Sequence, residues 1–278
     1  MWPELPSGPA DEMPELPEVE TIRRQLAPRI QGRRIQDAHS HESEKFTPAK
    51  DAIGTTIQGL NRRGKYLIAS LNDGRELIIH LGMTGSLTIS PDTSDDPYIR
   101  AWWHLDDTEY LAYRDVRRFG RIRCVPAGQY DTIPTLAAQG PDALSPEFTP
   151  DGFYQALRTS RRRIPTQLLS QKPVAGVGNI YGTEALWMAG IHPAKRQISR
   201  MAAEKLHAAL VEVLRAGLAN GGTTLRDYRN ADGGEGSHQN ALACYGRSGQ
   251  PCLRCATPLQ HRTYDARTLT FCPQCQPR

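Results

Sequence analysis

The feature that most constrains this chain is a pair of Cys-x-x-Cys motifs near its C-terminal end, separated by 16 residues. The four cysteines are Cys252, Cys255, Cys272 and Cys275. Two such knuckles present four thiolates at the tetrahedral geometry of a zinc site that leaves no open position for water. The spacing therefore predicts one structural Zn²⁺, and the segment between the knuckles is long enough for a β-hairpin.

Cysteine usage and the hydropathy pattern indicate where in the cell the protein is located. Cys-x-x-Cys pairs in a reducing environment indicate metal binding rather than disulfides, and we interpret Cys124 and Cys244 as buried small apolar residues. No apolar run reaches the ~18 residues of a membrane span. The first dozen residues lack the basic start and the apolar stretch of a signal peptide, so we expect a cytoplasmic protein without membrane contact.

Charge is divided unevenly along the 278 residues. Residues 1–157 hold 17 Lys and Arg against 23 Asp and Glu, a balance of −6, whereas residues 158–278 hold 17 against 7, a balance of +10; together they give the net charge of +4. A basic half of this kind favours a polyanionic partner, of which nucleic acid is the usual one. The alternative is an ordinary solvated basic surface.

Hydrophobic patterning predicts an α+β chain of two domains. Apolar residues at helical spacing follow Pro17, and acidic residues fill the first turn, so a helix begins there. A Pro- and Gly-rich segment at 127–150 is typical of a linker, and a one-sided apolar pattern predicts a long helix over residues 201–222. A hairpin turn signal lies at residues 72–74, among strand-like runs at 65–71, 76–82, 109–116 and 120–126.

Eight motifs, spread over residues 14 to 275, carry a resemblance to one family. They are, in chain order, PELPEVE (14–20), RRGKYL (62–67), HLGMTGSL (80–87), DVRRFG (115–120), GVGNIYGTEALWMAGIHP (176–193), GGTTLRDY (221–228), YGRSGQPC (245–252) and the four-cysteine ending. Together they resemble the bacterial formamidopyrimidine-DNA glycosylase family of DNA repair enzymes. The PELPEVE start differs from the PEGPE start of endonuclease VIII relatives and favours the formamidopyrimidine branch.

The resemblance implies a fold, a division into domains and an activity. The fold is α+β, with an N-terminal β-sandwich flanked by helices and a C-terminal helical domain that carries a helix–two-turn–helix motif and a four-cysteine zinc finger. The implied activity is excision of oxidised purines, such as 8-oxoguanine and formamidopyrimidines, from double-stranded DNA, followed by β,δ-elimination at the abasic site. The implied protein is a monomer associated with the nucleoid. Its divisions are a leader at 1–13, the catalytic sandwich at 14–126, the linker at 127–150, the helix–two-turn–helix domain at 151–240 and the zinc finger at 241–278.

The resemblance also implies catalytic roles. The mature N-terminus of the family is a proline, here Pro14, whose secondary amine attacks C1′ of the damaged nucleotide. A terminal α-amine has a pKa of roughly 8, so a useful fraction is unprotonated at neutral pH. Glu15 resembles the general acid/base, Lys65 a phosphate-contacting proton donor, and Arg267 the zinc-finger arginine of the second elimination. Glu18 is expected to orient the site; the alternative is that Glu15, Glu18 and Glu20 only favour a helix start.

Four further positions match DNA contacts of the family. Met83, Arg117 and Phe119 resemble the three side chains that fill the hole left by a flipped base. Asn179 follows a Gly turn, and together with the first N–H groups of the helix that begins there it is expected to hold a phosphate.

The chain also departs from the family pattern. Where the family often has a lysine, this chain has Pro165, and we expect the basic run 161–163, with Arg161, to take over that phosphate contact. A histidine pair of the family is replaced by Tyr98 and Arg100. The loop that covers the lesion in the family falls around residues 231–240 and does not follow the family sequence. These departures leave lesion preference open.

The position of Pro14 raises a question about the active form. Behind Met13 the nitrogen of Pro14 is part of an amide bond and cannot form an imine. Trp2 is bulky, so Met1 is poorly trimmed, whereas a chain begun at Met13 exposes Pro14 once the methionine is removed. We therefore expect the preceding segment to be a mis-called start or a removable leader. Two other functions stay open, namely an endonuclease VIII-like glycosylase for oxidised pyrimidines and a non-catalytic lesion-binding relative.

Overall fold

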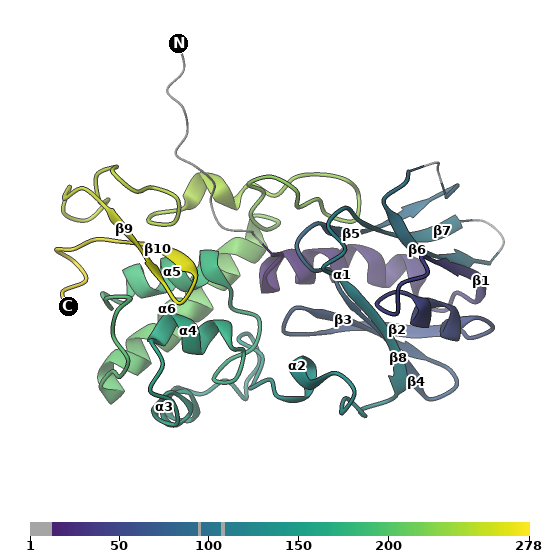
Figure 1. Cartoon of the computed structure of the whole chain (residues 1–278), viewed down its shortest axis with the longest axis horizontal. Helices are drawn as coiled ribbons and strands as arrows, with labels where there is room; N and C mark the ends of the chain where they lie inside the picture. The colour runs from purple at the N-terminus through teal and green to yellow at the C-terminus, as the bar shows by residue number, and fades with distance from the viewer. Residues whose placement is uncertain (1–12, 94–95, 107–108) are drawn as a thin grey trace, which may run out of the picture.

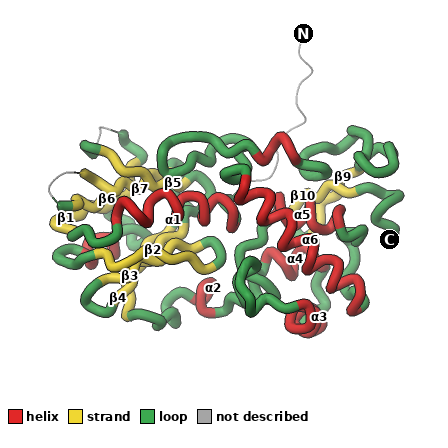
Figure 2. Tube along the Cα trace, turned by 180° about the vertical axis from the view of Figure 1, so that it is seen from behind, coloured by secondary structure: helices red, strands yellow, loops and turns green. Residues whose placement is uncertain are grey.

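The computed structural model describes residues 13–93, 96–106 and 109–278, so residues 1–12 of the expected leader lie outside the described part. The strands gather in one lobe, and most helices lie with the C-terminal hairpin in the other (Figure 1). Helix α1, Leu16–Ile30, runs along the strand lobe and reaches the helical lobe with its first turn (Figure 2). The expected α+β fold with two parts is confirmed.

The strand lobe contains two four-stranded antiparallel sheets, with strand orders β1-β6-β7-β5 and β2-β3-β4-β8. Four strands match the predicted runs, and residues 72–74 form the expected hairpin turn between β3 and β4, with Gly74 at a φ of 82°. The strands are β1 Ile35–Ser40, β2 Ile57–Arg63, β3 Tyr66–Leu71, β4 Arg75–His80, β5 Gly85–Ser90, β6 Ile99–Leu105, β7 Glu109–Asp115 and β8 Arg121–Pro126.

The other four strands lack a clear sequence signal for a physical reason. The register of β1, β2 and β6 shifts within the strand, so their side chains do not alternate regularly between the two faces. Strand β5 reads Gly-Ser-Leu-Thr-Ile-Ser, and its polar residues face outward. Both effects blur the alternation on which strand prediction depends.

Helix α1 and the 3-10 turn η1, Thr47–Ala52, close the core of the sandwich. Val19 and Leu26 of α1 are fully buried there, so the helical spacing in the sequence marks the buried face. Each such side chain contributes about 2 kcal/mol through burial. The helix begins at Leu16 rather than after Pro17, and Leu16 packs in the core of the helical lobe instead. Helix α1 therefore belongs to both hydrophobic cores.

The helical lobe confirms the long predicted helix as α6, Arg200–Ala219, which begins where the Ser199 hydroxyl accepts a hydrogen bond from the Ala202 amide at 3.2 Å. Helix α5, Asn179–Met188, is buried from residue 180 to residue 187. A helix buried on every side has no one-sided apolar pattern, so spacing could not predict its extent. The shorter helices are α3 Pro150–Arg158 and α4 Ile164–Leu169.

The segment predicted as a linker is packed against both lobes. It contains the short helix α2, Pro134–Ala137, in which Leu136 is fully buried. Asp142 accepts a hydrogen bond from Arg62 of β2 at 3.0 Å, and the same guanidinium pairs with Glu20 of α1 at 3.0 Å. One buried arginine thus joins α1, β2 and the connecting segment.

The C-terminal part contains η2, His238–Ala241, and an antiparallel hairpin of β9, Gln260–Tyr264, with β10, Arg267–Phe271. The hairpin lies between the two cysteine pairs, as the spacing predicted. In the described part of the chain, no helix combines the length and the apolar character that crossing a membrane requires.

Candidate active site and metal centre

Glu15 lies at the N-terminal end of α5. Its carboxylate accepts hydrogen bonds from the backbone amides of Gly178 at 2.6 Å, Ile180 at 2.8 Å and Tyr181 at 3.4 Å. We expected these amides to hold a phosphate, but in this structure the anion at the helix N-terminus is the carboxylate of the protein itself. The close approach requires glycine, because a Cβ atom on Gly178 would lie 2.3 Å from Cδ of Glu15.

Glu18 lies one turn further along α1 and connects three segments. Its carboxylate accepts hydrogen bonds from the Thr223 amide at 2.7 Å and from the Tyr181 hydroxyl at 2.8 Å. It also accepts one from the Glu15 amide at 2.8 Å, which caps the start of α1. Glu18 therefore serves the helix start and also fixes the position of Glu15 relative to α5.

Burial shifts the proton affinity of this cluster. Burial raises the pKa of Glu15 to about 7, a shift that the charge of Lys65 opposes and that of Glu18 increases. Burial also raises the pKa of Glu18. Lys65 is 6% exposed, and burial lowers its pKa, with the two carboxylates opposing the shift and Arg267 adding to it. Glu15, Glu18, Lys65 and Arg267 thus interact electrostatically, and Glu15 can gain and lose a proton near neutral pH.

Pro14 is buried directly before Glu15, where α1 meets the helical lobe. In the 278-residue chain its nitrogen forms the peptide bond with Met13. The position is the one that the resemblance implies for the nucleophile, but the amine itself requires a chain that starts at Pro14.

A loop at residues 116–119 presents Arg117 and Phe119 at the surface. Buried Asp115 holds the base of this loop, since its carboxylate accepts hydrogen bonds from the Thr84 hydroxyl at 2.6 Å and from the Gly120 amide at 2.8 Å. The guanidinium of Arg117 lies 4.9 Å from the centre of the Phe119 ring, which is 49% exposed. A cation and an aromatic ring are therefore paired at an exposed edge of the strand lobe.

Met83 lies in the neighbouring loop, which packs closely against the loop at residues 116–119. The Arg117 amide donates a hydrogen bond to the Thr84 hydroxyl at 3.0 Å, and a Cβ on Gly82 would lie 2.4 Å from the Gly120 nitrogen. Met83 is half-buried between these two contacts. The fold thus brings the predicted Met83, Arg117 and Phe119 into adjacent loops.

The residues that replace the histidine pair have different surroundings. Arg100 is 5% exposed and donates hydrogen bonds to the carbonyl oxygens of Asp115 at 2.8 Å and Pro97 at 3.0 Å. Tyr98 is 40% exposed, and the Arg100 and Arg114 guanidinium groups lie 5.7 and 5.0 Å from the centre of its ring. Arg100 therefore supports the strand from which the Arg117 loop starts.

Asn179, the first residue of α5, faces the C-terminal hairpin. Its side-chain amide donates a hydrogen bond to the Thr268 carbonyl oxygen at 3.2 Å, next to Arg267. Its Oδ1 atom is buried and has no hydrogen-bond partner in the structure. This contact places Asn179 and Arg267 on neighbouring segments.

The basic run at 161–163 is divided between two roles. Arg163 pairs with Asp265 at the hairpin turn at 2.8 Å and lies 5.0 Å from the centre of the Tyr264 ring. Arg161 and Arg162 are exposed, so both are accessible at the surface. Pro165 stands in the first turn of α4, where proline fits a helix without loss of a hydrogen bond.

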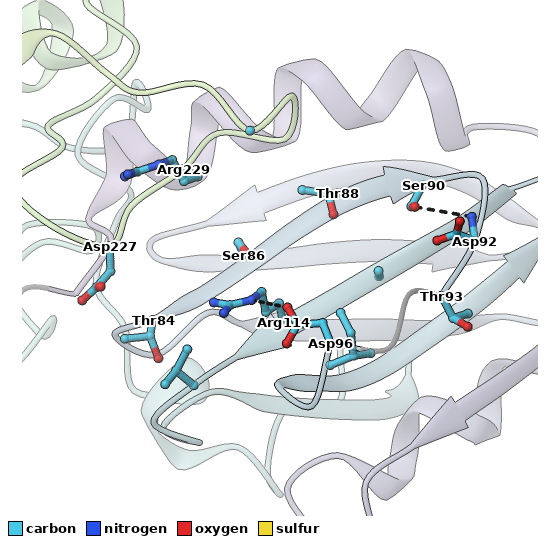
Figure 3. A pocket seen from close by; sticks show the side chains of 14 residues that line it. Thr84, Ser86, Thr88, Ser90, Asp92, Thr93, Asp96, Arg114, Asp227 and Arg229 are labelled. Carbon is cyan, nitrogen blue, oxygen red and sulfur yellow. Dashed lines mark hydrogen bonds and ion pairs between the residues drawn. The ribbon is translucent and has the colours of Figure 1, made fainter.

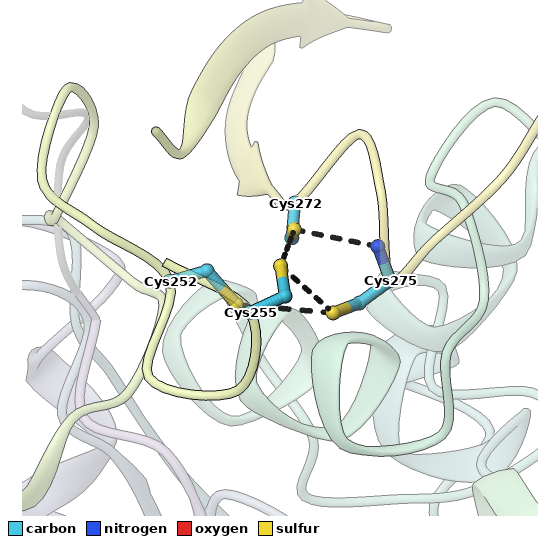
Figure 4. Close-up of side chains that lie close together, drawn as sticks. All are labelled: Cys252, Cys255, Cys272 and Cys275. Carbon is cyan, nitrogen blue, oxygen red and sulfur yellow. Dashed lines mark hydrogen bonds between the residues drawn. The ribbon is translucent and has the colours of Figure 1, made fainter. Parts of the chain in front are cut away.

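The four predicted cysteines come together at the base of the hairpin, and their sulfur atoms point toward one another (Figure 4). Sulfur–sulfur distances are 3.4 Å for Cys255–Cys275, 3.5 Å for Cys255–Cys272 and 3.9 Å for Cys252–Cys275. A tetrahedral site with metal–sulfur bonds of about 2.3 Å requires sulfur atoms about 3.8 Å apart. The donor set and its dimensions therefore fit a single metal ion.

The two remaining cysteines lie outside this cluster. Cys244 is buried as expected, and its thiol donates a hydrogen bond to the Thr270 carbonyl oxygen at 3.2 Å. Cys124, on β8, is only half-buried.

Two family models match the chain. The formamidopyrimidine-DNA glycosylase N-terminal domain matches residues 13–122, and the formamidopyrimidine-DNA glycosylase H2TH domain matches residues 139–229. The chain belongs to the formamidopyrimidine-DNA glycosylase family. It is a DNA glycosylase of base-excision repair with abasic-site lyase activity.

Relatives and solved structures agree with this family. The chain is 41% identical to the formamidopyrimidine-DNA glycosylase of Deinococcus radiodurans, with 95% of this chain and 98% of the relative covered. It is similar to the crystal structure of the MutM (Fpg) protein from Thermus thermophilus, with a TM-score of 0.88, 40% identity and coverage of 95% and 98%. A Lactococcus lactis Fpg complex with Fapy-dG-containing DNA gives a TM-score of 0.86 at 35% identity, covering 95% and 100%.

Two residues of the sequence motifs, His80 and Tyr181, also belong to the site, although the spacing of residues in the sequence did not reveal this. Burial, with the charges of Lys65 and Arg121, lowers the pKa of His80 to about 4, so its ring is neutral. Its Nδ1 accepts a hydrogen bond from the Gly82 amide at 3.1 Å, which leaves Nε2 as the donor. Tyr181 is the second: its hydroxyl bonds to Glu18, and its ring stacks on that of His238.

A hollow of about 370 Å³ lies on the outer face of β5 and β7, with Asp227 and Arg229 at one end of it (Figure 3). Hydroxyl groups of β5 line it, and Arg114 pairs with Asp96 inside it at 2.6 Å. Glu15, Glu18 and Lys65 are not among its lining residues. This hollow is therefore separate from the catalytic cluster.

Proposed function

We propose that this enzyme excises oxidised purines, namely 8-oxoguanine and formamidopyrimidines, from duplex DNA and cleaves the strand by β,δ-elimination. The related Lactococcus lactis enzyme has been crystallised with DNA that contains Fapy-dG and with DNA that contains an abasic site. The observation in this chain that best supports the proposal is the buried Glu15 carboxylate, which adjoins Pro14 and has a pKa of about 7. Such a group can give a proton to a sugar and take it back at neutral pH.

The proposed reaction starts at Pro14 as the first residue of the active chain. Its amine attacks C1′, a carbon–nitrogen bond forms, and the glycosidic bond breaks with its electron pair leaving on the base. The attacking nitrogen then loses its proton, which neutralises the departing base. Glu15 gives a proton to O4′ as the sugar ring opens, and the C1′–nitrogen bond becomes a cationic iminium. The iminium accepts electrons while C2′ loses a proton and the C3′–O bond breaks. Loss of a proton from C4′ then breaks the C5′–O bond.

Two cations complete the proposed chemistry. Burial lowers the pKa of Lys65, which eases proton transfer from its ammonium group to a leaving oxygen. Arg267 stands at the start of β10, next to the segment that contacts Asn179, where its charge can stabilise the departing phosphate. Asn179 and exposed Arg161 are proposed to contact phosphates on either side of the damaged nucleotide.

We propose that the Met83, Arg117 and Phe119 loops fill the space that the flipped base leaves. The guanidinium of Arg117 can donate to the unpaired cytosine, while Phe119 and Met83 stack against neighbouring bases. Support comes from the exposure of the Arg117–Phe119 pair and from Asp115, which holds the loop in place.

We propose Zn²⁺ as the ion of the four-cysteine cluster, one per chain, because four thiolates without oxygen ligands select this metal. All four donor positions come from the protein, so the ion supports structure rather than catalysis. We further propose that the protein acts as a monomer on chromosomal DNA, in the cytoplasm at the nucleoid.

The decisive experiment compares two proteins that differ only at their start. One is translated from Met13, so that removal of the methionine exposes Pro14; the other is the full chain with Met13→Leu, which blocks internal initiation and keeps Pro14 in an amide. Intact mass confirms each start, and borohydride trapping on an 8-oxoguanine duplex measures covalent adducts. We expect adducts only with the Pro14 form. Equal trapping by the full chain would place the nucleophile elsewhere.

The same assay separates the alternatives. A thymine glycol duplex, cleaved in preference to 8-oxoguanine, would favour a glycosylase for oxidised pyrimidines. Tight lesion binding by the Pro14 form with neither trapping nor strand cleavage would indicate a non-catalytic lesion-binding protein.

A further inference from the structure

The C-terminal end of α5 meets the four-cysteine cluster through Trp187. This side chain is 7% exposed and packs in one apolar cluster with Cys252 and Cys272. Its indole Nε1–H donates a hydrogen bond to Sγ of Cys252, with a nitrogen–sulfur distance of 3.5 Å. A residue of the helical core therefore touches a metal ligand directly.

The hydrogen bond from Trp187 stabilises negative charge on the cysteine sulfur atoms. Four thiolates around a divalent ion carry a net charge of −2, and part of that charge is buried because Cys252 and Cys272 are 3% and 0% exposed. A buried anion requires hydrogen-bond donors. The Cys275 amide supplies one to Sγ of Cys272 at 3.4 Å from within the knuckle. Trp187 supplies another from a different element.

Arg254 strengthens the donor. It stands between Cys252 and Cys255 in the first knuckle, and its guanidinium lies 4.1 Å from the centre of the Trp187 ring. A cation over the ring face withdraws π density and makes the indole N–H a better donor. The same guanidinium donates to the carbonyl oxygens of Trp187 at 3.0 Å and Met188 at 2.9 Å, which fixes the end of α5.

We propose that Trp187 is a positioning residue for the metal-binding thiolate of Cys252, and that its indole N–H sets how tightly the cluster holds its ion. The inference rests on the proposal that the cluster binds Zn²⁺. Phenylalanine at position 187 could fill much of the same space but carries no N–H. The contact therefore depends on tryptophan and not merely on an aromatic ring.

The first test uses the full chain loaded with Zn²⁺ and measures release of the ion to the chelator 4-(2-pyridylazo)resorcinol. Trp187→Phe should release Zn²⁺ about tenfold to a hundredfold more readily, the range typical of partners that orient a metal ligand. The matched control is Trp102→Phe on the outer face of β6, where the ring stacks on His39 and is remote from the cysteines. Trp102→Phe should release Zn²⁺ at the parental rate.

The second test separates the hydrogen bond from packing. In the Co²⁺-substituted protein, loss of the N–H donor should move the thiolate-to-cobalt charge-transfer band to lower energy, whereas a packing role leaves the band in place. Arg254→Gln should move the band in the same direction by a smaller amount. If Trp187→Phe fails to fold, 3-benzothienylalanine at position 187 keeps the ring shape and replaces only the N–H by sulfur.

The outcomes are distinct. An unchanged release rate together with an unchanged band, in either position-187 variant, overturns the role of Trp187 while the metal site stands. A parental protein that takes up neither Zn²⁺ nor Co²⁺ overturns both this inference and the proposed metal.

Discussion

Helix α5 has an acidic cluster at its first turn and a cysteine cluster at its last, and the two are assembled in different ways. Apart from the Glu15 amide, the amides that hold Glu15 and Glu18 come from residues 163 to 205 positions away in the chain. The four thiols come from two Cys-x-x-Cys pairs within one C-terminal segment. The metal centre is therefore a local centre, formed by residues close together in the sequence. The carboxylate cluster is a long-range centre, because it forms only when both lobes are folded. The pKa shift of Glu15 is a product of that long-range burial.

The largest effect should come from breaking the local centre. Cys272→Ser removes one of four ligands, and metal binding in such modules provides about 10 kcal/mol or more that is coupled to folding. We expect metal analysis to fall from one ion per chain to almost none, with early unfolding of the hairpin and weaker binding of duplex DNA. Cys124→Ser, on β8 outside the cluster, should keep its metal. Full metal content in Cys272→Ser would remove this cysteine from the ligand set.

Breaking the long-range centre should cost activity without loss of metal. Glu15→Gln removes the proton donor and also turns an amide NH₂ toward a backbone N–H of α5. We expect single-turnover excision of 8-oxoguanine to fall by about 10²–10⁴-fold, with one metal per chain retained. Glu204→Gln, an exposed change on α6, serves as the control. Near-parental excision by Glu15→Gln would refute its acid/base role.

A smaller loss of activity is expected from a substitution outside both the acidic cluster and the cysteine cluster. Arg117→Ala should reduce excision from a lesion-containing duplex by about tenfold to a hundredfold more than it reduces cleavage at a preformed abasic site. The difference reflects the few kcal/mol needed to open an intact base pair. Arg118→Ala removes the same charge from the next position and should affect both substrates alike. Equal losses for Arg117→Ala on the two substrates would contradict a role in filling the gap.

A smaller effect is expected when the excision rate is measured as a function of pH, without any substitution. The proton donor Glu15, with a pKa of about 7, is lost as pH rises above that value, while the Pro14 amine, with a pKa of roughly 8, becomes reactive as pH rises toward it. Excision by the Pro14 form should therefore follow a bell centred between pH 7 and 8, and change about tenfold per unit outside it. A flat profile from pH 6 to 9 would exclude this pair of groups.

Stability should respond to pH in a related way. Because the folded pKa of Glu15 lies above its ordinary 4.5, its contribution to the free energy of unfolding is fully present below pH 4.5 and is lost as pH rises through about 7. Thermal unfolding of the parental protein and of Glu15→Gln should accordingly converge or cross as pH increases. A constant difference over this range would show that Glu15 is not buried as an acid.

Spacing in the sequence predicted the four-cysteine cluster, whereas the carboxylate cluster was predicted only through resemblance. Cys-x-x-Cys spacing is enough for the ligand set, because the backbone between the two ligands of a pair is too short to separate them. Glu15 and Lys65 carry no such geometric link, and only the family motifs connected them before the fold brought them together. Helix α5 escaped full prediction because it is buried all round, and Arg100 because a buried arginine cannot be told from a solvated one by its neighbours in sequence.

Three glycines next to the acidic cluster limit which substitutions this sequence can accept during evolution. A methyl group at Gly176, Gly178 or Gly222 would stand 2.6 Å from Leu16, 2.3 Å from Glu15 and 3.0 Å from Glu18, respectively. Such a change cannot be absorbed at the surface, because Leu16 is fully buried and because Glu15 and Glu18 belong to the catalytic cluster. In a saturation library selected for repair, these three glycines should prove as intolerant as the glutamates, although they contribute no chemistry, while exposed positions such as Glu204 vary freely.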